Sequence, residues 1–233
     1  MNRQNKHKIE VYETLDSTNE YVKQRRGEGE NLIVVARSQT GGKGTKGRSF
    51  SSKTGGVYLS KLTFHQQFPA KRAFEVMAGA AVAVCKTLES FGVTPQIKWP
   101  NDVFVNDKKI CGILIENTFS GQEIACSIVG IGINVNNPLP QELQDIATTL
   151  SLQTGKTQDV DCVRNRLIAE LEKPCDMDAY LKFIAYMGRQ AMLLMGEKSV
   201  MAKLLHVDRE GGLHVEIGGE EKVFTAAEIS VRI

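Results

Sequence analysis

Apolar residues, many of them β-branched, gather in short runs through the first half of the chain, and turns rich in glycine, asparagine and aspartate separate these runs. Runs of this length and composition predict β-strands, and their close spacing from residue 96 onward predicts an antiparallel meander. The predicted strands cover residues 9–12, 31–37, 57–64, 96–99, 103–105, 108–116 and 123–135.

A helical period replaces the strand pattern in three places. Ser17 is followed three residues later by Glu20, and this capping box predicts a helix over residues 17–26. Apolar residues recur at helical spacing over residues 73–91, which predicts the longest helix, with one face packed on a sheet. Residues 141–190 also carry helical periodicity.

The last part of the chain returns to short runs separated by glycine turns. These runs predict strands over residues 200–206, 213–217, 222–225 and 229–233. Several short strands in so short a segment are typical of a small β-barrel. The sequence therefore predicts an α+β fold in which helices pack on a mixed, largely antiparallel sheet. It also predicts two domains: a main domain over residues 1–190 and a small β-barrel over residues 191–233.

Composition narrows the class of protein. The chain has 233 residues, of which 42% are hydrophobic and 24% charged, as is ordinary for a globular protein. A net charge of +2 is too small for binding nucleic acid over a broad surface, and no apolar run is long enough to span a membrane. The first residues lack the apolar segment of a signal peptide. We therefore expect a cytoplasmic protein that binds neither DNA nor a membrane.

The cysteines and histidines give no sequence signal for a metal site or for a disulfide. The five cysteines form no C-x-x-C pair, so we expect reduced, buried thiols. The four histidines, His7, His65, His206 and His214, lie too far apart in the sequence for the spacing of a metal site.

Residues 39–48 read Gln-Thr-Gly-Gly-Lys-Gly-Thr-Lys-Gly-Arg and so combine four glycines with three cations. Glycine lets the backbone approach a ligand closely, and the cations can donate hydrogen bonds to a phosphate or a carboxylate. A predicted strand leads into this loop, which favours an anion clamp, although a solvated basic loop explains the composition equally well. A nucleotide P-loop fits less well, because Arg48 stands where lysine belongs and residues 49–56 are poor helix formers.

Two further stretches carry unusual residues. Lys98 and the single tryptophan precede Asn101 and Asp102, for which a role in the turn alone is a strong alternative. Gly130 and Gly132 interrupt a predicted strand, and glycine weakens a strand unless something, such as a flat ligand, lies close to the backbone. A G-x-G dinucleotide loop is the weaker explanation, because no helix follows.

Taken in order, four stretches closely resemble biotin protein ligases over roughly residues 9–135. They are residues 16–19, residues 39–48, residues 98–102 with 109–112, and residues 130–134. The resemblance implies a class II synthetase-like fold of the biotin/lipoate ligase type, followed by an SH3-like barrel. It also implies that the protein makes biotinyl-5′-adenylate from biotin and ATP with Mg²⁺, and then transfers biotin to a lysine of a biotin carboxyl carrier domain. The resemblance is also compatible with a homodimer.

The resemblance also implies roles for individual residues. Those implied to contact biotin are Ser17, Thr18, Asn19, Gln39, Gly42, Lys43, Lys109, Gly112 and Gly130. Those implied to contact ATP or the adenylate are Lys43, Gly44, Thr45, Lys46, Gly47, Arg48, Phe50, Asn101, Gly132 and Asn134. Those implied at the reaction centre are Lys43, Lys98, Asp102 and Lys109, with Asp102 also a candidate metal ligand.

These residue types suit the implied chemistry. A carboxylate and a triphosphate must meet, so cations and Mg²⁺ are needed to offset their repulsion. The carboxylate is already ionised and needs no general base. In the second step the attacking lysine must lose a proton, and Asp102 is our hypothesis for the acceptor.

The chain departs from the family pattern in three ways. The loop commonly reads Gly-Arg-Gly-Arg-x-Gly-Arg, but here Lys43 replaces the first arginine and Thr45 removes a cation. Phe50 stands where tryptophan is usual. No segment ahead of residue 9 could form the helix-turn-helix of repressor members, so we expect an enzyme only.

Two alternatives remain beside the ligase. A lipoate–protein ligase or octanoyl transferase would share the fold, but the Arg-Arg-x-Ser-Gly-Gly-Gly type of loop is absent from the sequence. A biotin-sensing DNA-binding regulator is disfavoured by the net charge of +2.

Overall fold

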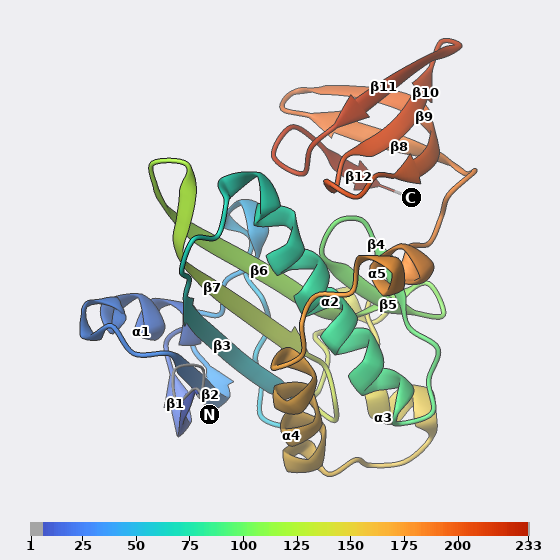
Figure 1. Ribbon diagram of the computed structural model, residues 1–233. Helices are drawn as coiled ribbons and strands as arrows, with labels where there is room; N and C mark the ends of the chain where they lie inside the picture. The colour runs from blue at the N-terminus through green and yellow to red at the C-terminus, as the bar shows by residue number, and fades with distance from the viewer. Residues whose placement is uncertain (1–6, 233) are drawn as a thin grey trace.

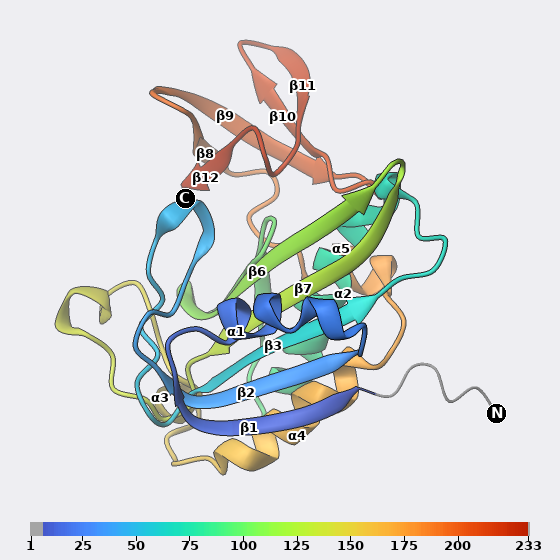
Figure 2. The same ribbon diagram turned by 90° about the vertical axis from the view of Figure 1, so that its left-hand side faces the viewer.

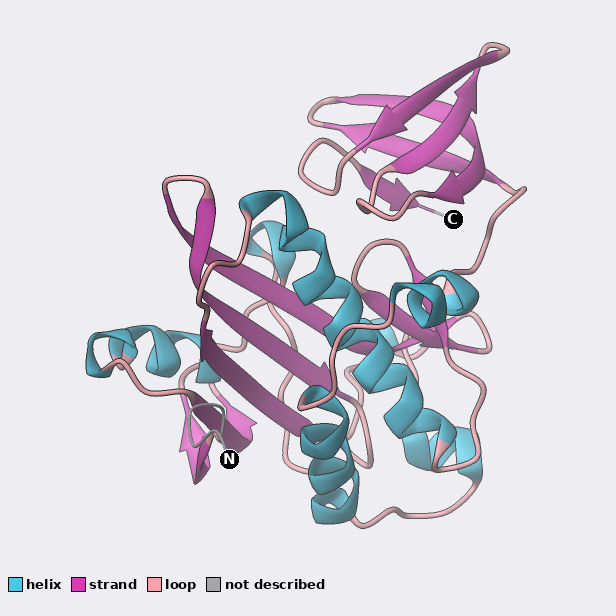
Figure 3. Cartoon of the chain, viewed as in Figure 1, coloured by secondary structure: helices cyan, strands magenta, loops and turns pink. Residues whose placement is uncertain are grey.

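The computed structural model describes residues 7–232, except for the side chain of Lys46. A large sheet and a smaller one dominate the described chain (Figures 1 and 3). The larger sheet has seven strands in the order β1-β2-β3-β7-β6-β5-β4. These strands are β1 (Lys8–Leu15), β2 (Leu32–Gln39), β3 (Val57–Phe64), β4 (Gln96–Lys98), β5 (Asp102–Val105), β6 (Lys108–Ser120) and β7 (Glu123–Ile133).

Strand pairing confirms the predicted meander. β4 to β7 pair in sequence order and antiparallel, whereas β1 and β2 are parallel to each other. β3 pairs with β2 on one side and with β7 on the other, rather than with β4, because α2 carries the chain across the sheet between β3 and β4. The sheet is therefore mixed and largely antiparallel, as predicted.

Helices cover both faces of the large sheet. α1 (Thr18–Gln24) lies on one face, over β2, β3 and β7, while α2 (Ala73–Glu89) lies on the other (Figures 1 and 2). The side chain of Ser17 caps α1 by accepting a hydrogen bond from the backbone N–H of Glu20, as the capping box predicts. α4 (Val160–Leu171) and α5 (Met177–Phe183) pack against α2.

Two clusters of buried side chains match these two faces. The cluster under α1 contains Val22 and Leu62, and the larger cluster under α2 contains Leu59 and Leu88. Leu59 and Leu62 lie on the same strand but face opposite ways, because side chains alternate along a strand. Both faces of β3 are thus buried, which explains its continuous apolar run.

The predicted helical segment over residues 141–190 is only partly correct. It contains α3 (Leu150–Thr154), α4 and α5, separated by loops, and it ends where β8 (Gln190–Met195) begins. The periodicity failed to show these breaks, although Gly155 and Pro174 mark two of them.

The smaller sheet is antiparallel in the order β11-β10-β9-β8-β12. Its strands are β8, β9 (Lys198–Val207), β10 (Leu213–Ile217), β11 (Glu220–Phe224) and β12 (Ser230–Arg232). It has one strand more than the four predicted, because the sequence pattern predicted no strand over residues 191–195, which form most of β8. The indole Nε1 of Trp99 donates a hydrogen bond of 3.1 Å to the carbonyl of Gly211 and so links the two sheets. The division into two domains near residue 190 stays a prediction.

Within residues 7–232, none of the helices combines the length and the apolar character that a bilayer crossing requires.

Candidate active site

A pocket of about 490 Å³ of atom-free space, part of it open to solvent, lies against the face of the large sheet that carries α1. The start of α1, the end of β2, the loop after β2, and β5 to β7 contribute its walls. Its lining residues are Ser17, Thr18, Asn19, Gln39, Lys43, Gly44, Thr45, Phe50, Asn101, Asp102, Lys109, Gly112, Ile113, Leu114, Gly130, Ile131 and Gly132. All four stretches identified in the sequence therefore meet in one pocket.

Gln39 holds the start of α1 against the end of β2. Its side-chain oxygen accepts hydrogen bonds from the backbone N–H of Thr18, at 2.8 Å, and from the Thr18 hydroxyl, at 3.1 Å. Its Nε2 donates to the hydroxyl of Ser52 at 2.8 Å. The free N–H groups of a helix start need such partners, so Gln39 both completes the helix cap and fixes this wall of the pocket.

A buried polar network continues from Thr18 into the sheet. The hydroxyl of Ser60, which is fully buried on β3, lies 2.7 Å from the Thr18 hydroxyl and also contacts the side-chain oxygen of Asn19. Asn19 in turn donates from Nδ2 to Glu116 on β6 at 2.9 Å. Buried polar groups that are satisfied in this way fix one side-chain arrangement. This wall is therefore preorganised.

The loop after β2 folds back on itself beside the pocket. The backbone N–H of Phe50 donates to the carbonyl of Gly42 at 2.9 Å, and the N–H of Gly44 donates to the carbonyl of Arg48 at 2.6 Å. Lys43 Nζ lies 2.8 Å from the Glu20 carboxylate on α1. Hydrogen bonds and charge from Lys23 first, and then from Lys43, lower the pKa of Glu20 to about 2. An anionic ligand would have to compete with Glu20 for Lys43.

Phe50 covers two glycines on neighbouring strands. Gly112 and Gly132 are paired in the register of β6 and β7, and a Cβ on Gly132 would come 2.5 Å from the Phe50 ring. A Cβ on Gly130 would come 2.2 Å from the side-chain oxygen of Asn19. Side chains of Asn19 and Phe50 thus occupy the space that a Cβ at Gly130 or Gly132 would need, and the flat ligand inferred from the sequence stays a prediction.

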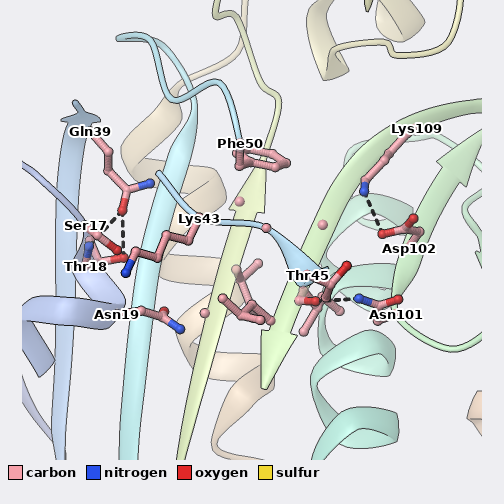
Figure 4. A pocket seen from close by; sticks show the side chains of 17 residues that line it. Ser17, Thr18, Asn19, Gln39, Lys43, Thr45, Phe50, Asn101, Asp102 and Lys109 are labelled. Carbon is pink, nitrogen blue, oxygen red and sulfur yellow. Dashed lines mark hydrogen bonds and ion pairs between the residues drawn. The ribbon is translucent and has the colours of Figure 1, made fainter. Parts of the chain in front are cut away.

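On the opposite side of the pocket, Lys109 Nζ forms an ion pair of 2.7 Å with the Asp102 carboxylate. Figure 4 shows this pair across the pocket from Lys43, Thr18 and Gln39. β5 and β6 are antiparallel neighbours in which Asp102 pairs with Gly112 and Phe104 with Lys109, so Asp102 and Lys109 lie diagonally across the two strands. Asn101 donates from Nδ2 to the carbonyl of Ile113 at 2.7 Å, so its side chain links the turn to β6, while its role toward ATP stays a prediction.

Some residues assigned by resemblance do not line the pocket: Lys98, Gly42, Gly47, Arg48 and Asn134. Burial lowers the pKa of Lys98, whose Nζ lies 5.4 Å from the centre of the Phe104 ring. Asn134 is buried and accepts a hydrogen bond from Asn137. The side chain of Lys46 lies outside the described part of the structure. The roles assigned to all six residues stay predictions.

Several residues of this site gave no functional signal in the sequence. Ser60, Ser52 and Glu116 complete the network behind Thr18, Asn19 and Gln39, and Glu20 holds Lys43. Ile113, Leu114 and Ile131 complete the pocket wall. A serine inside the apolar run of β3 was the one local signal for Ser60, because a polar residue there needs a buried partner.

The arrangement places one lysine on each side of a pocket whose floor is sheet. Such a pocket can hold an anionic ligand whose two ends face Lys43 and Lys109. Asp102 is the one carboxylate among the lining residues in the described part of the chain, so a proton acceptor or a metal ligand is also at hand.

Known proteins resemble this chain in sequence and in fold. A family model described as the biotin/lipoate A/B protein ligase family matches residues 11–134, which is more than half of the chain. The chain belongs to this family. Among its curated relatives, the bifunctional ligase/repressor BirA of Bacillus subtilis is 40% identical over 149 residues, which are 62% of this chain and 46% of the relative. The chain thus spans less than half the length of that relative.

Members of the family with solved structures match over a greater length. The biotin protein ligase from Aquifex aeolicus in complex with biotin and ATP is 30% identical, with a TM-score of 0.77. The match covers 96% of this chain and 98% of that one. The apo structure from the same organism gives 27% identity and a TM-score of 0.78. The α+β fold with its small second sheet is therefore the fold of these biotin/lipoate ligases.

Proposed function

We propose that this protein is an ATP-dependent biotin–protein ligase. It joins biotin to ATP as biotinyl-5′-AMP and then transfers biotin to a lysine of a biotin carboxyl carrier domain of a carboxylase. One observation carries the proposal: the four sequence stretches converge on one pocket. The similarity to a biotin protein ligase solved with biotin and ATP, of which the chain covers 98%, supports it.

In the first step, a carboxylate oxygen of biotin attacks the α-phosphorus of ATP, and pyrophosphate leaves. Both reactants are anions, so Lys43 and Lys109 reduce their repulsion and stabilise the charge that develops on the phosphate. We assign Lys109 to the biotin carboxylate and later to the acyl phosphate. Ser17, Thr18 and Gln39 would face the biotin ring, on the wall that their hydrogen bonds already fix.

In the second step, the amine of the acceptor lysine attacks the acyl carbon, and AMP leaves. The amine must lose a proton on the way to the amide. We assign this proton to Asp102, whose carboxylate Lys109 positions at 2.7 Å.

Mg²⁺ enters with ATP as part of the substrate. Proteins usually hold Mg²⁺ through one or two carboxylates together with substrate phosphates. Asp102, the one carboxylate among the described pocket-lining residues, fits such a set.

The choice of biotin over lipoate needs its own argument, because the family contains ligases of both kinds. Curated relatives from Paracoccus denitrificans and Mycobacterium tuberculosis are named biotin–[acetyl-CoA-carboxylase] ligases. The glycine-rich loop typical of lipoate enzymes is absent from the sequence. Titration calorimetry with biotin and with lipoate tests this choice, and tighter binding of lipoate would contradict it.

The central test incubates the purified protein with biotin and ATP labelled at the α-phosphate. We expect labelled biotinyl-5′-AMP, and then biotin on a carrier domain once that domain is added. Lipoate in place of biotin is the control. Failure to form an adenylate with biotin would overturn the proposal.

We further propose that the protein works in the cytoplasm, as an enzyme without DNA binding. All five cysteines are free, as a reducing compartment requires, but the expectation that all are buried is wrong, because Cys162 is exposed and Cys175 is half-buried. The net charge of +2 favours no extended contact with DNA. A gel-shift assay at low salt tests the second point, and light scattering tests for a homodimer.

A further inference from the structure

Three side chains with metal-binding atoms gather on the smaller sheet, far along the chain from the pocket residues. His206 lies on β9, His214 on β10 and Glu221 on β11, and these strands are adjacent in the sheet (Figure 1). His206 and His214 are Cα partners across the β9–β10 pair. Their neighbours Val207, Leu213 and Val215 are buried in the core, so the two histidines lie on the opposite, outer face.

The side-chain nitrogen and oxygen atoms of these three residues lie close to one another. The imidazole rings are stacked, with centroids 4.1 Å apart and planes 18° apart. One nitrogen from each histidine and one carboxylate oxygen of Glu221 all lie within 4.8 Å of one another. Zinc–nitrogen and zinc–oxygen bonds are about 2.0–2.2 Å long, so in a tetrahedral site the ligand atoms lie roughly 3.4 Å apart. The three atoms must therefore move closer together and the stacked rings must tilt for one ion to reach all three.

Asp208 supplies the support that metal-bound histidines usually have. Its Oδ2 lies 3.1 Å from His214 Nε2, and its Oδ1 accepts backbone hydrogen bonds from Glu210 and Gly212. His214 Nδ1 lies at hydrogen-bond distance, 2.6 Å, from Glu221, so a proton lies between them; an ion that binds here replaces this proton while Nε2–H donates to Asp208. A carboxylate behind a ligating imidazole fixes the tautomer and raises the basicity of the ligand.

We propose that His206, His214 and Glu221 form a binding site for a divalent transition metal, with Zn²⁺ the best match. Two imidazoles and one carboxylate suit zinc, nickel or copper, whereas Mg²⁺ and Ca²⁺ prefer oxygen ligands alone. Three protein ligands leave a coordination position for water. The site is separate from the active-site pocket, since none of its residues lines that pocket.

The ion would crosslink β9, β10 and β11 at one edge of the smaller sheet. β11 is an edge strand that pairs with β10 alone, and its residues are mostly exposed. A metal held by His206 and Glu221 bridges β9 and β11 across β10. An ion that binds only the folded sheet stabilises that sheet by mass action. We therefore expect the bound ion to slow the local opening of β11.

Titration calorimetry with zinc sulfate on the full-length chain, free of any histidine tag, tests the site. We expect one equivalent of Zn²⁺ to bind, and His206→Ala and His214→Ala each to weaken binding at least about tenfold, as the loss of a ligand should. Asp208→Asn should weaken it by about tenfold or more through the lost support of His214. Two matched controls should bind as the parent does: Glu220→Ala, next to Glu221 on β11, and Cys162→Ser, which removes an exposed thiol.

Three further measurements complete the test. Circular dichroism checks that each variant is folded. Co²⁺ substituted for Zn²⁺ should give visible absorption bands that disappear in His214→Ala. Amide exchange should slow along β11 when Zn²⁺ is added, while adenylate formation stays unchanged in His206→Ala. Absence of Zn²⁺ binding to the parent, or equal affinity in both histidine variants and the parent, would overturn the proposal.

Discussion

Lys109 and Asp102 neutralise each other at 2.7 Å on one side of the pocket, and the proposed reaction uses both. If Lys109 holds the biotin carboxylate, Lys109→Ala removes a charge-assisted contact of about 1.5–3 kcal/mol, which lowers the rate of adenylate formation roughly tenfold to a hundredfold. Single-turnover kinetics with labelled ATP measure this. Lys108→Ala is the matched control, because Lys108 is adjacent but donates to the carbonyl of Gln144. Equal rates in both variants would leave Lys109 without a role in the reaction.

Glu20 joins the loop to α1, and its titration gives a prediction about stability. Because pairing with Lys23 and Lys43 lowers its pKa to about 2, its contribution is fully present above the unfolded carboxyl pKa of about 4.3 and is lost as pH falls through about 2. We expect Glu20→Gln to lower the free energy of unfolding at pH 7 and to flatten its dependence on pH between about 4.3 and 2. Urea unfolding at several pH values measures both effects.

The control for Glu20 is Glu142→Gln, which changes an exposed glutamate in the short helix over Gln141–Leu143. A Glu20→Gln profile that parallels the parent profile would show that the ion pairs with Lys23 and Lys43 contribute nothing to stability.

At the scale of elements, the loop over residues 39–48 is the part that ligand binding should change most. Four glycines make its ordering costly in backbone entropy, so we expect biotin and ATP to supply the free energy that orders it. Trypsin should therefore cut after Lys43 or Arg48 in the free protein and more slowly in the complex. Cleavage after Arg209, in a turn of the smaller sheet, is the internal control. Equal protection at all three sites would argue against closure of the loop.

Thr45 lines the pocket within the same loop, at the position where the family usually has a cation. Arg48 donates from Nη2 to the Thr45 hydroxyl at 3.1 Å, so the threonine supports the loop but supplies no charge. A hydrogen bond to a charged group is worth about 1–1.4 kcal/mol more than a neutral one, which is roughly fivefold to tenfold in affinity. We therefore expect the adenylate to leave the parent about tenfold faster than it leaves Thr45→Arg.

Release of labelled adenylate, followed by rapid filtration, measures this difference, and Lys46→Ala is the comparison. If Thr45→Arg matches the parent while Lys46→Ala speeds release, Lys46 carries the phosphate contact and the role assigned to position 45 is wrong.

At the scale of the whole molecule, Gly211 is where the smaller sheet meets the main one. Its carbonyl accepts from Trp99, its φ is +90°, and a Cβ there would come 2.2 Å from the Phe74 ring on α2. Gly218 also has a positive φ, +62°, but a Cβ there would meet open space. We expect Gly218→Ala to cost about 1 kcal/mol of stability from backbone strain alone, and Gly211→Ala to cost a further 1–3 kcal/mol, roughly, from overpacking.

Urea denaturation of the two alanine variants measures this difference directly. Equal destabilisation of the two variants would mean that the Phe74 ring moves away from the added methyl group at position 211 without a measurable cost in free energy. A second unfolding transition in Gly211→Ala would indicate that the smaller sheet unfolds on its own, which also tests the predicted boundary near residue 190.

Local sequence patterns by themselves determined the large sheet's strands, the capped start of α1 and the length of α2. They succeeded because apolar alternation, helical spacing and capping depend on residues within a few positions of one another. The order of four short stretches also indicated the family before any contact was visible. The breaks between α3, α4 and α5 were missed, because the helical period was followed across Gly155 and Pro174, which are the local break signals.

The tertiary structure alone decided which side chains meet. Strand order and register, rather than local pattern, bring Lys43 to Glu20 and place Phe50 over Gly132. The same holds for His206 and His214, whose spacing in the sequence predicted no metal site, yet whose rings stack because β9 and β10 pair in that register. A slip of one residue would turn either histidine to the other face of the sheet, and no local signal in the sequence specifies that register.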